Sequence, residues 1–256
     1  MLPDKAKKLI LKSIKEKLGK QKIGRPRKNL DCALEGVIFY IKNSCSLREI
    51  PKVYGSSSTI YYWIRRLAES NCFQSIWKKI LRDLHKQKKL DLSHISIDCS
   101  ITKAPGGGAK TAKNPFDKGK LATKKSIAVD AQGIPIALAI GTSCQHDSRL
   151  FRPTLEAIDP FIRRIYSTIH VDKAYDSKSV EVAIFNHYYL PNIARKKNRK
   201  LPMKVKLKKS CHRWKVERTF SWINRFRGTF VRWIRLEKVY LQMLYYVLAV
   251  ITLRFL

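Results

Sequence analysis

Three acidic residues in a strongly basic chain are the best candidates for chemistry. Glu217 is the single acid within residues 195–218, which hold twelve lysines and arginines, whereas Asp98 and Asp172 each follow a short apolar run. A cluster of such carboxylates repels itself unless cations lie between its members, and oxygen ligands suit Mg²⁺ or Mn²⁺. Two such ions roughly 3.5–4 Å apart activate an attacking oxygen and stabilise the leaving oxygen of a phosphodiester. The residue types therefore indicate two-metal chemistry on a phosphodiester, if the fold brings the three acids together.

Each acid also has a structural interpretation. A Glu in a basic helix is most often one partner of an ion pair with a residue three or four positions away. An Asp at the end of a strand is more often a turn former, because its side chain accepts hydrogen bonds from nearby backbone N–H groups. The order of the three acids along the chain favours the metal site.

The segments that must position these acids alternate between strand and helix patterns. Alternating or continuous apolar runs predict strands over 95–98, 126–129, 134–140, 165–171 and 189–193, with a hairpin turn at 130–133. Helical patterns cover 147–158, 176–186 and a segment after the basic stretch. This order predicts a mixed α/β domain with a five-stranded sheet. Asp98 then ends the first strand and Asp172 the fourth, so the two meet if those strands are neighbours.

The third acid lies on a predicted helix with two different faces. At 3.6 residues per turn, Arg213, Ser221 and Asn224 share the face of Glu217. The opposite, apolar face is expected to be buried, and it comprises Val216, Phe220, Ile223, Phe226 and Phe230.

The first 90 residues are predicted to form a helical, helix-turn-helix-like DNA-binding domain, and residues 91–256 the α/β domain. An apolar helical stripe begins at Leu30, a capping box at 46–49 opens a second short helix, and Ser56–Thr59 caps a third helix over 60–69. A further helix over 73–86 closes the domain. In a helix-turn-helix the later helix enters the major groove, which makes its exposed residues the candidate base contacts: Tyr61, Tyr62, Arg65 and Arg66. The alternative is a three-helix bundle without a ligand.

Overall charge points to a polyanionic partner. The chain carries 53 Lys and Arg against 19 Asp and Glu, a net charge of +34, and such a field attracts nucleic acid at long range. Arg25 and Arg27 stand in a short basic segment after a basic helix over 6–18, and they are candidate minor-groove contacts. A plain basic linker is equally compatible with that segment.

Other patterns disfavour a membrane protein or a zinc protein. The bases are spread along the whole chain, and the longest apolar run, Val239–Leu253, is interrupted by Gln242, which predicts a buried helix rather than a membrane span. The six cysteines form no Cys-x-x-Cys pair, so reduced cysteines in a cytosolic protein are expected.

Several motifs, taken in order, resemble one family: the bacterial insertion-sequence transposases with a DDE triad on a ribonuclease-H-like core, specifically the insertion-sequence-five group. The motifs are IDCS at 97–100, APGGGAKTAKNPFDKGK at 104–120, VDAQGIPIALAI at 129–140, HDS at 146–148, VDKAYDS at 171–177 and RWKVERTFSWINRFRG at 213–228. The segment PKVYGSSSTIYYWIRRL at 51–67 is similar to the DNA-binding region of the group.

The resemblance implies a ribonuclease-H-like core and a catalytic triad of Asp98, Asp172 and Glu217, with Arg213 as the arginine four residues before the last acid. It implies two Mg²⁺ or Mn²⁺ ions on the triad and double-stranded DNA as partner, both the element ends and the target. A homodimer or larger assembly on DNA, without a membrane, in the bacterial cytoplasm at the nucleoid, is also implied. The expected activity is cleavage at terminal inverted repeats and transfer of the freed 3′-hydroxyl ends into target DNA.

The sequence departs from the wider superfamily at two positions. A Tyr three residues before the arginine and a Lys seven residues after the glutamate are replaced by Ser210 and Asn224. Arg225 and Arg227 are candidates for the phosphate contact expected of that lysine. A catalytically silent DNA-binding relative or regulator of the element is the alternative to an active transposase.

Two further motifs are not expected to be catalytic. In the glycine-rich segment Pro105–Thr111, Ala109 stands where a P-loop requires glycine, so a flexible loop on the DNA side is the better interpretation. His146 and Asp147 follow a predicted strand, where a capping or packing role is more common than catalysis.

Overall fold

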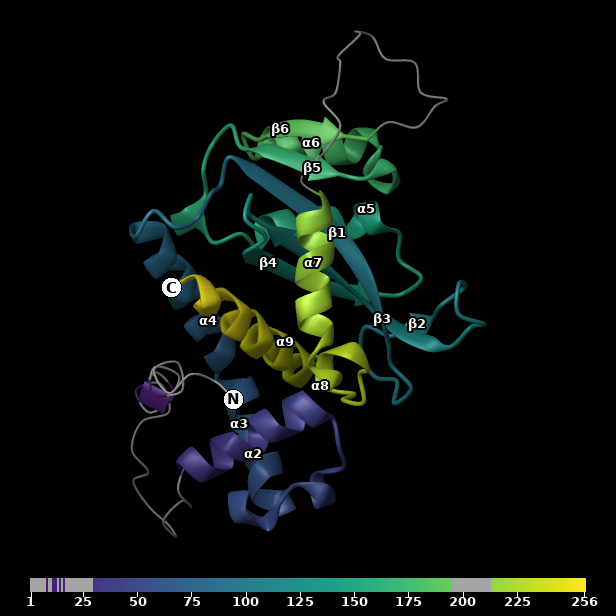
Figure 1. The fold of residues 1–256 in the computed structure, drawn as a ribbon. Helices are drawn as coiled ribbons and strands as arrows, with labels where there is room; N and C mark the ends of the chain where they lie inside the picture. The colour runs from purple at the N-terminus through teal and green to yellow at the C-terminus, as the bar shows by residue number, and fades with distance from the viewer. Residues whose placement is uncertain (1–7, 9–10, 13, 15, 17–29, 195–212) are drawn as a thin grey trace, which may run out of the picture.

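The computed structural model describes residues 8, 11, 12, 14, 16, 30–194 and 213–256 of the chain, drawn in colour in Figure 1. The predicted basic helix over 6–18 lies almost wholly outside the described residues. Arg25, Arg27 and Ser210 lie outside them as well.

The N-terminal region is helical. It comprises α2 (Leu30–Asn43), the 3₁₀ turns η1 (Leu47–Glu49) and η2 (Lys52–Tyr54), α3 (Ser57–Glu69) and α4 (Cys72–Lys86). The predicted capping box is confirmed, since the Ser46 side chain accepts a hydrogen bond from the backbone and Glu49 accepts one from the Ser46 N–H at 2.8 Å. The predicted second helix is wrong, because Pro51 forces Ile50 into an extended conformation and splits the segment into two single turns. Ser56 caps α3 as predicted.

In the part of the chain that the structure describes, the sheet has six strands: β1 (His94–Lys103), β2 (Ala112–Lys113), β3 (Leu121–Val129), β4 (Pro135–Thr142), β5 (Thr168–Val171) and β6 (Leu190–Ile193). The order is β2-β3-β1-β5-β6, with β4 also paired to β3. The strands β4, β3 and β1 are antiparallel neighbours, and β5 and β6 then continue from β1 in parallel. Three antiparallel strands followed by two parallel ones form a ribonuclease-H-like core, as predicted. The sixth strand is the two-residue β2, which the five-stranded prediction lacked.

The first strand is longer than predicted. β1 stays in register with β3 from Ser96 opposite Val129 to Lys103 opposite Ala122. Asp98 therefore lies within β1 rather than at its end, so the predicted strand boundary is wrong. Antiparallel pairing with the long β3 extends β1 beyond the apolar run at 95–98 from which the strand was predicted.

Helices cover both faces of the sheet (Figure 1). α5 (Asp147–Glu156) lies on the face of Ser126, whose hydroxyl accepts a hydrogen bond from Thr154 at 2.7 Å. α7 (Arg213–Asn224) lies on the opposite face, where Lys125 donates to Asn224. Adjacent strand residues point to opposite faces, so these contacts place α5 and α7 on opposite sides of β3.

The helix that carries Glu217 is shorter than the predicted apolar face requires. α7 ends at Asn224, and Val216, Phe220 and Ile223 are buried as predicted. Phe226 instead precedes a short helix, α8 (Arg227–Phe230), and Phe230 is 55% exposed, so the prediction that it is buried is wrong.

The C-terminal helix α9 (Glu237–Thr252) joins the two halves of the chain. It packs against α3 and α4, and the Trp77 indole donates a hydrogen bond to the Thr252 hydroxyl at 3.2 Å. The segment Glu237–Phe255 is long and apolar enough to cross a bilayer, yet 67% of it is buried within the protein, as expected for a core helix. The division of the chain at residue 90 stays a prediction, and the core is continuous across it.

Candidate active site

The first two acids come from neighbouring parallel strands. β1 and β5 pair with Ser96 opposite His170, and two positions further along each strand stand Asp98 and Asp172. Side chains two residues apart share a face of a sheet, so both carboxylates lie on the face covered by α7. Asp172 directly follows β5, and its carboxylate accepts a hydrogen bond from the Lys173 N–H at 2.7 Å.

The third acid reaches the same place from α7, and Arg213 joins the three. The Arg213 guanidinium lies 3.2 Å from an oxygen of Asp172, 3.8 Å from one of Glu217 and 3.9 Å from one of Asp98. The side chains of Asp98, Asp172 and Glu217 are 20%, 38% and 62% exposed, respectively. Asp98 is therefore the least exposed acid of the cluster, and Glu217 is the most exposed.

The cluster carries more negative charge than Arg213 balances. The pKa of Asp98 is raised to about 6, chiefly by burial and also by the charges of Asp147 and Asp172, although the Cys99 N–H and Arg213 act to lower it. A nearby cation favours the charged form of such a carboxyl. Carboxylate oxygens from three elements are suitable ligands for Mg²⁺ or Mn²⁺. Among the described residues, no three acidic, His or Cys side chains are already spaced around one metal position, and Arg213 stands among the acids.

The β3–β4 turn fixes the position of α7. Lys215 donates a hydrogen bond to the Ala131 carbonyl, and the Thr219 hydroxyl donates to the Gly133 carbonyl at 2.7 Å. The turn at 130–133 is the hairpin predicted from the sequence, and Gly133 has a positive φ of 88°. These bonds lie on both sides of Glu217 along the helix, so they set where its carboxylate meets the strands.

The sequence did not indicate a buried lysine beside the site. The Lys125 side chain is fully buried, and its amine donates to the Asn224 side chain at 3.1 Å and to the Thr229 carbonyl at 3.2 Å. Burial lowers its pKa to about 7. The pair Lys124-Lys125 resembles the polar end of a strand, which is why the predicted strand began only at Ser126. Asn224, which replaces the superfamily lysine, thus accepts a hydrogen bond from an amine on β3.

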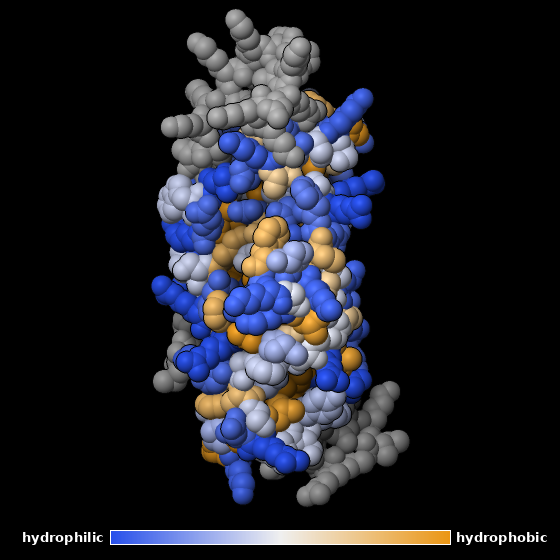
Figure 2. Space-filling model, turned by 90° about the vertical axis from the view of Figure 1, so that its right-hand side faces the viewer, coloured by the Kyte–Doolittle hydropathy of each residue, from blue (hydrophilic) through white to orange (hydrophobic). Residues whose placement is uncertain are grey.

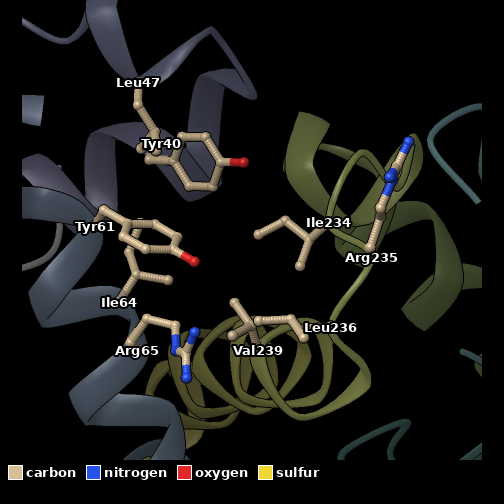
Figure 3. Close-up of a pocket in the computed structure, with 9 residues that line it drawn as sticks. All are labelled: Tyr40, Leu47, Tyr61, Ile64, Arg65, Ile234, Arg235, Leu236 and Val239. Atoms are coloured by element: carbon tan, nitrogen blue, oxygen red, sulfur yellow. The ribbon is translucent and has the colours of Figure 1, made fainter. Parts of the chain in front are cut away.

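The candidate base contacts on α3 are partly turned toward the C-terminal half. Tyr61 and Arg65 line a cavity of about 420 Å³ between α3 and the segment that leads into α9. Figure 3 shows the Tyr61 hydroxyl pointing into this cavity, opposite Ile234 and Val239. The Arg65 side chain is 47% exposed and pairs with Glu69 at 3.3 Å.

The remaining candidates for DNA contact lie at different depths. Tyr62 is 44% exposed, whereas Arg66 is only partly exposed and its Nε atom is buried without a hydrogen-bond partner in the described structure. Arg225 and Arg227 are exposed where α7 ends and α8 begins. A role in DNA binding stays a prediction for all of them.

The glycine-rich segment is packed rather than free, so the interpretation as a flexible loop is wrong. A Cβ atom on Gly106 would lie 2.7 Å from the Trp233 carbonyl oxygen, and one on Gly108 would lie 2.4 Å from that of Arg235. Arg235 also donates to the Gly106 carbonyl at 2.9 Å. The glycines thus allow close backbone contact with the segment before α9. His146 is the N-cap of α5, which agrees with the capping role.

A ribonuclease-H-like sheet with carboxylates from β1, the end of β5 and a following helix is the arrangement expected of DDE transposases. The comparison with protein families agrees: residues 89–252 match the model described as "Transposase DDE domain". The chain belongs to this DDE transposase family. Residues 2–77 match a second model, "Putative transposase of IS4/5 family".

The chain is also similar to individual proteins. The chain is 28% identical over 177 residues to a "Putative transposase for insertion sequence element IS402" of Burkholderia cepacia, covering 66% of this chain and 81% of that protein. It is also similar to the solved structures of the Mos1 transposase paired-end complex, at 13% identity and a TM-score of 0.28, and of a piggyBac transposase synaptic complex, at 15% and 0.39. The matches cover 71% and 82% of this chain, respectively, but only 63% and 52% of those two chains.

Proposed function

We propose that this protein is an active transposase that binds the terminal inverted repeats of its insertion sequence, cleaves them and transfers their 3′-hydroxyl ends into target DNA. The observation that carries the proposal is the convergence of Asp98, Asp172 and Glu217 on one guanidinium at 3.2–3.9 Å. Three elements separated in sequence bring these acids together, which the structural interpretation of each single acid does not require.

The acids would hold two divalent ions, Mg²⁺ or Mn²⁺. Asp98 and Asp172, held by β1 and β5, form the rigid part of the site, and Glu217 supplies its exposed side. When bound, the ions activate the attacking oxygen and stabilise the leaving oxygen of the phosphodiester. Basic side chains around the site would hold the DNA backbone in place.

Double-stranded DNA is the proposed partner, at both the element ends and the target. The net charge of +34 supports it, and Figure 2 shows hydrophilic side chains over much of one face, with hydrophobic residues gathered between them. Tyr61 and Arg65 border the cavity before α9, so DNA read by α3 would also lie near the C-terminal half. Two DNA ends require two active sites, so we propose a homodimer or larger assembly on DNA at the nucleoid.

Charge-neutral variants test the triad. Asp98→Asn, Asp172→Asn and Glu217→Gln each keep the shape of the side chain but remove ligand charge. Nicking of a terminal-repeat duplex, taken from inverted repeats that flank the gene, is expected to fall by several orders of magnitude with Mg²⁺ or Mn²⁺. Affinity for the same duplex should persist.

A matched control separates catalysis from folding. Glu156→Gln changes an exposed acid that pairs with Arg152 on α5, on the opposite face of the sheet from α7, and it should leave nicking unchanged. Thermal melts of every variant report the folded fraction. Near-normal nicking by well-folded Glu217→Gln would refute the enzyme assignment and favour the silent DNA-binding relative.

A further inference from the structure

Arg213 touches every acid of the candidate site. One of its terminal nitrogens lies 3.2 Å from Asp172, and the other lies 3.9 Å from Asp98 and 3.8 Å from Glu217. A sequence-based i,i+4 pair accounts for the contact with Glu217 alone. The contacts with β1 and β5 make Arg213 a shared counter-ion for carboxylates from three elements.

Among the described residues, the ion pairs of Arg213 are those with the three acids of the candidate site. The described part of α7 begins at Arg213, and its first turn contains no acid. The three carboxylates therefore provide the favourable interaction at this place, and they do so at oxygens that metal ligation requires as well.

The Arg213 guanidinium and a divalent ion would compete for the same carboxylate oxygens. Mg²⁺ binds carboxylate oxygens at about 2.0–2.1 Å with near-octahedral geometry, which draws the oxygens closer together than they lie around a planar guanidinium. A dication among the same three acids also repels the Arg213 guanidinium, because both carry positive charge.

We propose that Arg213 is a displaceable counter-ion of the acid cluster: it holds the carboxylates together without metal, competes with divalent ions for them, and is released on metal binding to contact a DNA phosphate. The inference rests on the proposed function, because it assumes that these acids bind metal. Metal binding and DNA binding are then coupled through one side chain, and such coupling must be reciprocal.

The first test measures metal binding alone. Titration of the full chain with Mn²⁺, with the free ion followed by electron paramagnetic resonance, gives an affinity without any cleavage. Arg213→Gln is expected to bind Mn²⁺ about three- to tenfold more tightly than the wild type, because it removes the competitor. The Tm should be lower for this variant without metal, and Mn²⁺ should raise it by more than it raises that of the wild type.

A second arginine on α7 provides the control for charge. Arg218 bonds to the Gln132 carbonyl and stacks on Trp214 and Trp222, so Arg218→Gln removes the same charge without touching the acids. It should tighten Mn²⁺ binding less than Arg213→Gln does. Equal or weaker Mn²⁺ binding by Arg213→Gln than by the wild type overturns the proposal, because Arg213 would then position the acids for metal.

The second test measures the release of Arg213 toward DNA. Ca²⁺ is the ion used to avoid cleavage, and the affinity for a terminal-repeat duplex is compared with and without it. The gain in affinity on adding Ca²⁺ should be larger for the wild type than for Arg213→Gln. Equal gains would overturn the DNA part of the proposal. If Arg213→Gln does not fold, Arg213→Lys keeps the charge but loses the planar fork, and it should still bind Mn²⁺ more tightly than the wild type.

Failure of this inference is distinguishable from failure of the proposed function. Loss of Mn²⁺ binding in Asp98→Asn and Glu217→Gln establishes the metal site independently of Arg213. If these variants bind Mn²⁺ like the wild type, the proposed function fails first. If they lose binding and Arg213→Gln does not gain it, only the competition fails.

Discussion

Replacing Lys125 by Met is expected to stabilise the protein at pH 6, although it removes two hydrogen bonds. The amine is fully buried, and its hydrogen-bond partners among the described residues are the neutral Asn224 and Thr229. Burial lowers its pKa from 10.5 to about 7. At about 1.4 kcal/mol per pKa unit, holding the charged amine costs folding about 4–5 kcal/mol. In Lys125→Met, the Asn224 side-chain oxygen and the Thr229 carbonyl lose their donor. This loss costs about 1–1.5 kcal/mol for each acceptor and offsets part of the gain. The net gain expected at pH 6 is about 2 kcal/mol.

The difference in stability between Lys125→Met and the wild type changes sign as the pH rises. Below pH 7 the amine is protonated in both the folded and the unfolded chain, so the full cost is present. Between pH 7 and 10.5 the unfolded chain holds a proton that the folded chain has released, so the stability of the wild type rises with pH in this window. At about 1.4 kcal/mol per pH unit, the difference between wild type and Lys125→Met should therefore shrink from pH 7 upward and change sign near pH 8.5.

Urea denaturation followed by tryptophan fluorescence, at pH values from 6 to 10, measures this difference. Lys124→Met is the control, because this neighbour points to the other face and pairs with Asp147 at 2.5 Å. It should destabilise the protein at neutral pH by leaving that carboxylate without its partner. The reasoning is refuted if Lys125→Met is less stable than the wild type at pH 6, or if the two differ by a constant amount across the range.

Three further outcomes are expected. Gly108→Ala should lower the free energy of unfolding by about 3 kcal/mol in thermal melts, because φ is 111° and its Cβ would collide with the Arg235 backbone. Gly119 has open space around it, so Gly119→Ala should cost only about 1 kcal/mol. Equal costs for the two variants would contradict the packing argument. Arg82→Met should cost about 2 kcal/mol in urea denaturation, since Asp159 is 1% exposed and loses a 2.8 Å partner; an unchanged midpoint would show that the pair contributes nothing. Affinity for random duplex should fall steeply with salt, with a log–log slope of about −0.9 per phosphate contact, and a flat response in fluorescence anisotropy would argue against DNA as the partner.

The order of the elements follows from local patterns, whereas their lengths depend on distant partners. Alternation over 95–98 and the caps at Ser46 and Ser56 are properties of a few adjacent residues, and each was predicted. The continuation of β1 to Lys103 depends on β3, which lies about twenty residues further along the chain. The packing of Gly108 against Arg235 is likewise a contact between distant segments, so a local interpretation gave a free loop.

In the candidate site, too, the sequence indicated the residues themselves but not the contacts between distant elements. The sequence singled out the three acids and Arg213 and made their meeting conditional on neighbouring strands, and the structure meets that condition. It could not show that Arg213 touches Asp98 and Asp172, because those contacts cross between elements. Lys125 escaped for the opposite reason: a lysine in an alternating pattern indicates solvent, and only the surrounding helices reveal that it is buried. The catalytic roles of the acids stay a prediction.

The contact between α4 and α9 has a consequence for how the chain folds during synthesis. Gln74 and Trp77 bond to Gln242 and Thr252, partners 168 and 175 positions further along the chain. At about 5–20 residues per second, a ribosome needs roughly 10–30 s to make the intervening segment. The apolar face of α4 stays uncovered for that time, and late contacts of this kind slow folding. Translation that stops before residue 237 would leave the N-terminal helices without α9, their packing partner, so a fragment that ends there should be less stable than the full chain.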